Sequence, residues 1–369
     1  MKLLSKCVIA TSLLTAWSAP AQDAALKDAF KDHFLIGAAL NQSQFSGQSS
    51  CEVSIVEQQF NSISPENVLK WESVHPKPDQ YNFGPGDNYV EFGLTHRMFI
   101  IGHNLVWHSQ TPAWVFKDDR GEPPTRDALL SRMHDHIAIV VGRYKGKIGG
   151  WDVVNEALDE DGSLRKSSWQ KIIGDDYLLK AYEFAHEADP DAELYYNDYS
   201  IENPRKRAGA MALIRNLQAH GAHISGIGLQ GHYDLTWPSA ALLDEALNDF
   251  SKLGVKIMIT ELDINVLPRA GQAQSADVAN RAEMRGGINP YTNGLPAEMQ
   301  TKLAARYAEL FRVFIKHKEI GRVTFWGVTD AGSWLNNYPV RNRTNYPLLF
   351  DRQCQAKPAF GAVLKTAVP

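Results

Sequence analysis

The sequence is poor in the features that mark metal, nucleotide or nucleic-acid binding. It has only three cysteines, and neither they nor the histidines fall at the spacing of a zinc site. The glycine-rich patterns that cradle a dinucleotide or a nucleotide phosphate are missing. Positive charge is not in excess, because 42 acidic residues outnumber 38 basic ones, whereas nucleic acid and anionic membranes attract a basic surface. We therefore expect no cofactor and no metal ion, and neither nucleic acid nor a membrane as a partner.

The sequence also lacks an apolar run long enough to anchor its start in a membrane. The stretch Cys7–Trp17 is too short to span a bilayer, follows the basic residues Lys2 and Lys6, and precedes a small-residue cleavage pattern. This order is typical of a secretory signal peptide. We predict a signal peptide of residues 1–21, cleavage after Ala21, and a protein that is secreted or periplasmic.

Cleavage would leave two cysteines, Cys51 and Cys354, which are far apart in the sequence. An oxidising compartment permits a disulfide between them. Their spacing does not decide whether they meet, so a disulfide and two free thiols both stay open.

Apolar runs alternate regularly with amphipathic stretches along the rest of the chain. This alternation predicts the α/β class and a (β/α)8 TIM barrel, formed as a single catalytic domain by residues 22–369 and most simply monomeric. An open, doubly wound sheet is the alternative. The longest irregular connection, Leu267–Pro296, is either a lid or a surface excursion. The expected strands are Phe34–Ala38, Asn61–Ser64, Met98–Asn104, Ile148–Glu156, Glu193–Asp198, Gly226–His232, Lys256–Asp263 and Arg322–Gly327, and the clearest helices are Asp127–Tyr144, Tyr177–Ala188, Pro204–His220, Ala240–Leu253 and Glu298–Lys318.

Polar residues at the ends of the predicted strands indicate where the chemistry lies. The fourth strand runs directly into Asn155 and Glu156, and a buried carboxylate is costly unless partners meet it. The seventh strand ends in the same way at Glu261. The carboxyl ends of barrel strands form the face that carries catalysis. We therefore expect Glu156 and Glu261 to face each other across one cleft.

Two carboxyl groups across a cleft are what glycosidic bond cleavage requires, one as acid and the other as nucleophile or base. A separation of roughly 5–5.5 Å would predict retention of anomeric configuration, and a wider one inversion. Asp263 projects to the same side of its strand as Glu261, and His232 ends the adjacent strand, so a charged network would keep Glu261 ionised as nucleophile. Glu156 follows the neutral Asn155 and has no cationic neighbour in sequence, which predicts a raised pKa and a role as general acid and base.

The remaining strand ends have the composition of a sugar-binding surface. Flat aromatic faces and a few hydrogen-bonding groups are the expected form of such a site. The candidate platforms are Trp107, Trp326 and Trp334, and the candidate hydrogen-bonding residues are Glu66, Asn67, Lys70, His103, Asn155 and Gln230. We expect the other tryptophans Trp71, Trp151, Trp169 and Trp237 to belong to the core.

These segments together resemble those of glycoside hydrolase family 10, whose members are chiefly endo-β-1,4-xylanases on a (β/α)8 barrel. The resemblance covers essentially the whole chain after the signal peptide, with its motifs in the family's order. The matching segments are Glu66-Asn67-x-x-Lys70-Trp71, Gly102-His103-x-Leu105-x-Trp107-His108-x-Gln110-x-Pro112-x-Trp114, Trp151-Asp152-Val153-Val154-Asn155-Glu156, Asn197-Asp198-Tyr199, Gln230-Gly231-His232, Thr260-Glu261-Leu262-Asp263, Trp326-Gly327 and Ser333-Trp334.

The resemblance implies a retaining double displacement on xylan and xylo-oligosaccharides. It implies Glu156 as acid and base, Glu261 as nucleophile with support from His232 and Asp263, and Asn155 as the partner of the sugar 2-hydroxyl. The residues implied to bind substrate are Glu66, Asn67, Lys70, His103, Trp107, Gln110, Gln230, Trp326 and Trp334, with Tyr199 on the leaving-group side. The chain departs from the family pattern at Ser200, where asparagine is common, and in the length of the connection Leu267–Pro296.

Three other functions stay open at this level. A related barrel enzyme acting on β-glucan, such as a cellulase, would use the same two glutamates. A metal-dependent hydrolase would instead use His103, His108, His232 and Glu261 as ligands. A non-catalytic carbohydrate-binding protein would need the tryptophans but not the two carboxylates.

Overall fold

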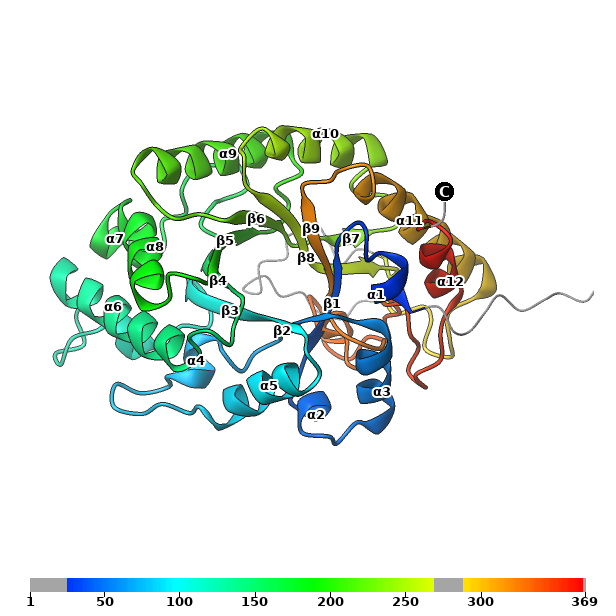
Figure 1. Ribbon diagram of the computed structural model, residues 1–369, viewed down its shortest axis with the longest axis horizontal. Helices are drawn as coiled ribbons and strands as arrows, with labels where there is room; N and C mark the ends of the chain where they lie inside the picture. The colour runs from blue at the N-terminus through cyan, green and yellow to red at the C-terminus, as the bar shows by residue number, and fades with distance from the viewer. Residues whose placement is uncertain (1–24, 269–287, 368–369) are drawn as a thin grey trace, which may run out of the picture.

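A computed structural model describes residues 25–268 and 288–367, and these form a closed barrel of parallel strands (Figure 1). Eight strands close on themselves, because β6 pairs with β8 and β9 pairs with β1, while β7 (His232–Asp234) lies outside and pairs only with β8. The barrel strands are β1 (Leu35–Leu40), β2 (Ser62–Pro65), β3 (Phe99–Trp107), β4 (Gly150–Asn155), β5 (Glu193–Asp198), β6 (Gly226–Leu229), β8 (Lys256–Asn265) and β9 (Ile320–Phe325). The predicted (β/α)8 barrel is confirmed, and the open-sheet alternative is wrong. The predicted signal peptide and most of the connection Leu267–Pro296 fall outside the described residues.

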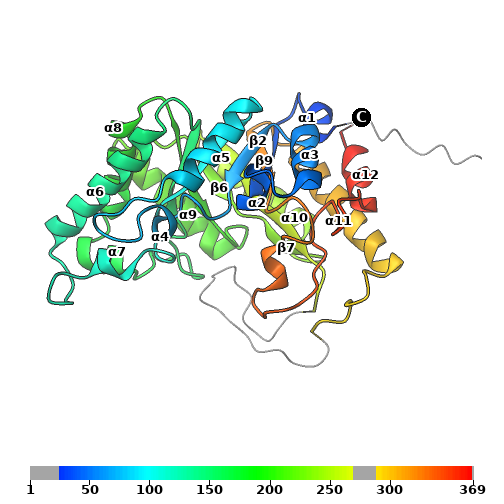
Figure 2. The same cartoon turned by 90° about the horizontal axis from the view of Figure 1, so that it is seen from below.

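Helices surround the barrel and cover its outer face (Figures 1 and 2). None of those in the two described ranges combines the length and apolarity needed to cross a bilayer. The α-helices are α1 (Leu26–Ala29), α2 (Gln42–Phe45), α3 (Ser50–Gln59), α4 (Trp71–Val74), α5 (Gly84–Thr95), α6 (Arg126–Arg143), α7 (Ser168–Ile173), α8 (Tyr177–Ala188), α9 (Pro204–Ala219), α10 (Ala240–Ser251), α11 (Ala297–Phe314) and α12 (Pro358–Leu364), with 3₁₀ turns η1 (Ala113–Phe116) and η2 (Trp334–Asn336).

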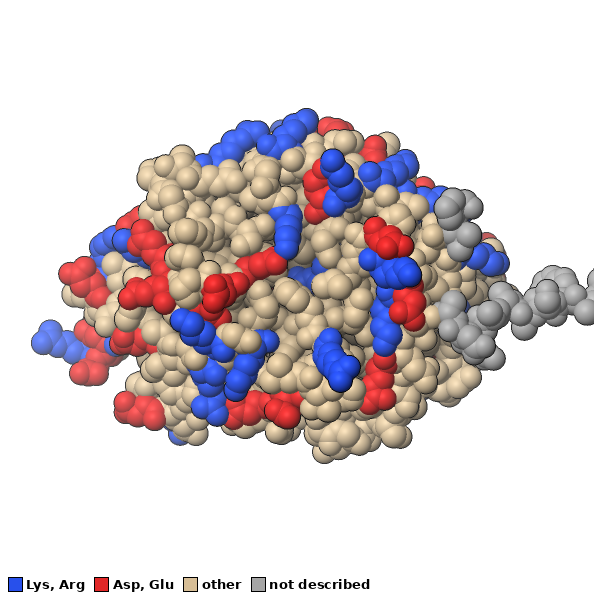
Figure 3. All heavy atoms as spheres, in the orientation of Figure 1, with Lys and Arg blue, Asp and Glu red and all other residues tan. Residues whose placement is uncertain are grey.

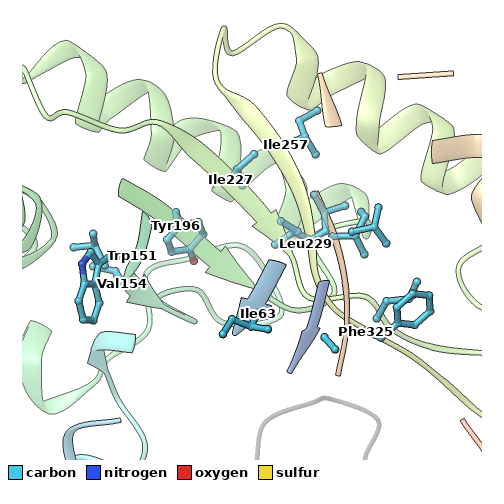
Figure 4. Close-up of a cluster of buried hydrophobic side chains, with 14 of the residues drawn as sticks. Ile63, Trp151, Val154, Tyr196, Ile227, Leu229, Ile257 and Phe325 are labelled. Atoms are coloured by element: carbon cyan, nitrogen blue, oxygen red, sulfur yellow. The ribbon is translucent and has the colours of Figure 1, made fainter. Parts of the chain in front are cut away.

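The strands alternate between two apolar environments. Ile257 and Ile259 of β8 belong to the large cluster that includes the helix residue Phe250, whereas Met258 between them joins a small separate cluster with Tyr195. Successive side chains of a strand point to opposite faces, so the large cluster packs between sheet and helices and the small one lies within the barrel. The residues labelled in Figure 4 belong to the large cluster and come from β2, β4, β5, β6, β8 and β9.

The sixth predicted strand was wrong in one respect that matters for the site. The structure breaks Gly226–His232 at Gln230 and Gly231, so that His232 begins the separate strand β7. Gly231 adopts φ 82°, a left-handed conformation that glycine reaches without steric cost. The break turns the chain outward and sets His232 opposite Asp263 of β8.

The clearest predicted helices agree with the structure to within a few residues, whereas α5 was not predicted. It begins with Gly84 and Pro85, a pair that reads as a turn in sequence. Proline is tolerated in the first turn of a helix, where its missing N–H would have no partner. Packing against β2 and β3 then decides the conformation of this segment.

Charges of both signs are interspersed over the face of the molecule shown in Figure 3. This distribution matches the small formal net charge of −4. Such a surface gives no directed attraction to a polyanion on that face.

A disulfide joins the first and last parts of the barrel. Cys51 of α3 bonds Cys354, which lies 303 residues further along the chain. Beside it, the buried Glu52 accepts a hydrogen bond of 2.6 Å from the Thr329 hydroxyl, just beyond β9. The question that the sequence left open is thus answered in favour of a disulfide, which sits near the seam where β1 meets β9.

Removing this disulfide should destabilise the protein. Cys51→Ser, Cys354→Ser and the double variant should each lower the free energy of unfolding by about 2–5 kcal/mol, because the bond closes a very long loop in the unfolded chain. Denaturant titration with and without reductant measures the loss. The three variants and the reduced wild-type protein should have the same free energy of unfolding, since all lack the same bond. A wild-type unfolding midpoint that does not change on addition of reductant would contradict the prediction.

Candidate active site

The carboxyl ends of the barrel strands surround a cavity of about 210 Å³. Its walls come from β3, β4 and β8, from the segments that follow β2, β3, β4, β6 and β9, and from the first residue of β7. The lining residues are Glu66, Asn67, Lys70, His103, Trp107, Gln110, Asn155, Glu156, Gln230, His232, Glu261, Trp326 and Trp334. The structure therefore brings together all of the predicted site residues except Asp263 and Tyr199, which lie behind this wall.

Glu261 is held by a charged network. His232 Nε2 lies 3.0 Å from Glu261 Oε2, and His232 Nδ1 lies 3.0 Å from Asp263 Oδ1. Burial by itself would lower the pKa of His232. The negative charge of Asp263 and its hydrogen bond to the imidazole, together with the same two effects of Glu261, raise this pKa to about 10. The imidazole is therefore protonated at neutral pH and donates to both carboxylates, while Trp334 Nε1 donates to Asp263 Oδ2 at 2.7 Å.

The consequence for Glu261 is a lowered pKa. Burial by itself would raise the pKa of this carboxyl, and the hydrogen bond and charge of His232 outweigh that effect. A hydrogen bond of 2.7 Å from Asn197 Nδ2 to Glu261 Oε1 acts in the same direction. Glu261 is thus an ionised carboxylate near neutral pH, although it is only 5% exposed.

Glu156 has the opposite electrostatic character. Burial raises its pKa, and this effect exceeds the opposing influence of His108 and the hydrogen-bond donors around it. Trp107 Nε1 donates to Glu156 Oε2 at 2.8 Å, and Gln230 Nε2 donates to Glu156 Oε1 at 2.9 Å. The indole and amide donors that orient this carboxyl are neutral, and burial keeps its protonated form present to higher pH than that of an ordinary glutamate.

Asn197 is the functional residue that sequence reasoning left out. It is the next-to-last residue of β5, in register with Asn155 of β4, and it donates through Nδ2 both to Glu261 Oε1 and, at 2.9 Å, to Asn155 Oδ1. Asn155 in turn donates to Glu156 Oε1 at 3.3 Å, so two amides connect the two carboxyls. Asn197 has the same place at a strand end as Asn155, and that position was the available signal.

A glycine on the neighbouring strand makes room for this amide. A Cβ atom added to Gly228 of β6 would lie 2.6 Å from Asn197 Oδ1 and 2.7 Å from the side chain of Thr260. Thr260 uses this space to donate its hydroxyl to Asn197 Oδ1 at 2.6 Å. The absence of a side chain at Gly228 therefore leaves the room that this hydrogen bond between Thr260 and Asn197 occupies.

The opposite wall of the cavity carries polar side chains around Lys70. Its Nζ donates to Asn67 Oδ1 and Gln110 Oε1, each at 3.0 Å, and lies 5.2 Å from the centroid of a Trp107 ring. Burial lowers the pKa of Lys70, against the opposing charges of Glu261 and Glu66. Such pre-oriented donors and acceptors suit the hydroxyls of a sugar.

The aromatic residues divide into cavity and core. Trp107, Trp326 and Trp334 line the cavity, and Trp326 meets His103 edge to face at 5.4 Å between ring centroids. Trp71, Trp151 and Trp169 are almost fully buried in the core, and Trp237 packs half-buried against it. Flat aromatic side chains in a cavity are the kind of surface on which a sugar ring can stack.

His103 and His232 form hydrogen bonds with carboxylates and do not belong to a cluster of metal ligands. Both ring nitrogens of His232 face carboxylates, and His103 Nδ1 lies 2.9 Å from Asp152 Oδ2. Within residues 25–268 and 288–367, no three His, Cys, Asp or Glu side chains converge as metal ligands would. The metal-dependent reading of His103, His108, His232 and Glu261 therefore gains no support from these contacts.

Comparisons with known proteins agree with this geometry. The family model described as "Glycosyl hydrolase family 10" matches residues 25–366. The "Endo-1,4-beta-xylanase A" of Xylanibacter ruminicola is 41% identical over 366 residues, covering 99% of both chains. The solved structure of a GH10 endoxylanase from a sugarcane soil metagenome superimposes with a TM-score of 0.90 at 44% identity, covering 92% of this chain and 99% of that one. An intracellular xylanase of Thermoanaerobacterium saccharolyticum, solved as a mutant in complex with xylotriose, gives a TM-score of 0.80 at 36% identity, covering 93% and 99%.

Proposed function

The chain belongs to glycosyl hydrolase family 10, and on that premise we propose that it is an endo-β-1,4-xylanase that cleaves internal bonds of xylan with retention of configuration. The observation that carries the proposal is the pair Glu156 and Glu261 in one cavity with pKa values shifted in opposite directions. One carboxyl that stays protonated and one that stays ionised are the acid and the nucleophile of a double displacement. The names of the xylanases compared above support xylan as the substrate.

In the first step the Glu261 carboxylate attacks the anomeric carbon, and Glu156 donates its proton to the departing glycosidic oxygen. A covalent glycosyl ester on Glu261 forms as the glycosidic bond breaks. In the second step Glu156, now ionised, removes a proton from water, which attacks the same carbon and releases Glu261. The two inversions restore the original configuration.

The surrounding residues serve these steps by position and charge. The His232 imidazolium keeps Glu261 ionised before attack, and a carboxylate of lowered pKa is a good leaving group in the second step. Asn155 lies between the catalytic carboxyls, in reach of a sugar 2-hydroxyl bound over Glu261. Trp326 and Trp334 offer ring faces to the bound sugars, while Lys70, Asn67 and Glu66 offer hydrogen bonds.

The direct test is hydrolysis of glucuronoxylan and arabinoxylan beside carboxymethylcellulose, with products resolved by size. We expect xylo-oligosaccharides of intermediate length from xylan at early times and a rate on the cellulose derivative lower by about 100-fold or more. Proton NMR of fresh products should show the β-anomer first. A preference for the cellulose derivative would indicate a β-glucanase.

The inactive control is Glu261→Gln, which keeps the size and hydrogen-bonding capacity of the side chain. Turnover should fall by about 10⁴-fold or more, because no covalent intermediate can form. Binding of xylohexaose, measured by calorimetry, should survive within a few-fold. Undiminished saccharide release by this variant would show that Glu261 is not the nucleophile, whereas a wild-type protein that binds xylohexaose but releases no saccharide would have only a carbohydrate-binding role.

The pH dependence of kcat/KM should be bell-shaped. Activity is lost as pH falls and Glu261 takes up a proton, and it is lost as pH rises and Glu156 gives one up. Trp107→Phe removes a donor that stabilises ionised Glu156, so the basic limb should move to higher pH while the acidic limb stays in place. Trp237→Phe, outside the cavity lining, is the matched control and should move neither limb, and a shift of the Trp107→Phe profile to lower pH would contradict the assignment.

We also propose that the protein is exported. The pattern of residues 1–21 supports this, although these residues lie outside the described ranges, and the disulfide between Cys51 and Cys354 suits an oxidising compartment. Intact-mass measurement of protein recovered from culture medium or periplasm should give a chain that begins at Gln22. A full-length chain confined to the cytosol would contradict export.

A further inference from the structure

We propose that Arg165 is a positioning residue that locks the acid Glu156 and the buried Tyr199 into one unit. It lies on the segment between β4 and α7, and its side chain is 15% exposed. Its Nε donates to the backbone carbonyl of Glu156 at 3.1 Å, and its Nη2 donates to the Tyr199 hydroxyl at 2.9 Å. This inference rests on the proposed function, because the property that Arg165 controls is proton delivery to a leaving group.

The backbone of Glu156 is the reason that such a lock is needed. The residue follows the last residue of β4 and adopts φ 56°, in the left-handed region that glutamate rarely occupies. A conformation of this kind persists only where surrounding contacts over-determine it. One contact is the hydrogen bond from Glu156 N to Asn197 O at 2.9 Å, and the Arg165 guanidinium supplies the other, on the carbonyl side.

The loop that carries Arg165 is itself fixed to the strand end. Arg165 N donates to Ala157 O at 2.7 Å, and Leu158 pairs with Leu164 in an antiparallel bridge. The guanidinium also donates through Nη2 to Leu158 O at 3.1 Å. The planar fork thus holds two carbonyls of the turn that contains the acid, which a lysine ammonium cannot match.

Tyr199 is the fixed point at the other end of the lock. It is only 2% exposed, and Lys206 Nζ lies 3.4 Å from the centroid of its ring. Lys206 is held in place by a fully buried ion pair of 2.9 Å with Asp198. The family resemblance implies a place for Tyr199 on the leaving-group side; its side chain is buried outside the cavity lining, where it transmits the rigidity of β5 and α9 to Arg165.

The test compares Arg165→Met with wild type on two aryl β-xylobiosides, one with phenol and one with 2,4-dinitrophenol as leaving group. Phenol needs a proton from Glu156 and dinitrophenol does not, so kcat/KM should fall by roughly tenfold or more on the first and by less than about threefold on the second. Glu156→Ala sets the upper limit of this difference. Equal losses on both substrates, or no loss on either, would overturn the proposal.

Two further variants keep the test decisive. Arg132→Met removes an arginine that bonds three backbone carbonyls of a different segment, those of Trp114, Val115 and Lys117, and should not change the ratio of the two rates. If Arg165→Met does not fold, Arg165→Lys should show the same leaving-group dependence at a smaller scale, and a constant ratio there would overturn the proposal. A wild-type protein that cleaves neither glycoside would overturn the proposed function as well as this inference, whereas an active wild type with a constant ratio overturns only the inference.

Discussion

The site depends on one protonated imidazole between two buried carboxylates. Glu261 and Asp263 lie two positions apart on β8, so their side chains point to the same side of the strand. Each is almost fully buried. Two such charges could not be buried side by side without a cation, since an unpaired buried charge costs several kcal/mol. His232 supplies that cation, and the strand β7 on which it sits exists only because the chain breaks at Gly231. The short strand β7, which lies outside the barrel, therefore carries the residue that keeps the proposed nucleophile Glu261 ionised.

The two glutamates show how environment gives one residue type two functions. Glu261 has a cation and an amide within hydrogen-bonding distance, whereas Glu156 has an indole and amides. Both carboxyls are almost fully buried, so desolvation pushes both pKa values upward, and for Glu261 the His232 imidazolium, with smaller contributions from His103 and Asn197, reverses the direction of the shift. Asn197 and Asn155 connect them without transferring charge. Neutral amides thus connect the acid and the nucleophile through hydrogen bonds.

The sequence was most informative where one residue's role follows from its position on a strand. The barrel and the spacing of Glu261 and Asp263 depend on local periodicity, and these predictions agree with the structure, whereas the sixth predicted strand ran past the end of β6. It was least informative where position depends on distant partners. The role of Arg165 depends on a tyrosine 34 residues away and on a backbone angle at Glu156. The conformation of α5 depends on packing against strands, which outweighs its glycine- and proline-rich start.

The disulfide between Cys51 and Cys354 determines how a pulling force on the two ends of the chain would be carried through the protein. Every residue that lines the cavity lies between these two cysteines, from Glu66 to Trp334. Tension applied to the two ends of the chain would therefore pass across the sulfur–sulfur bond and bypass the 303-residue loop that holds the cavity.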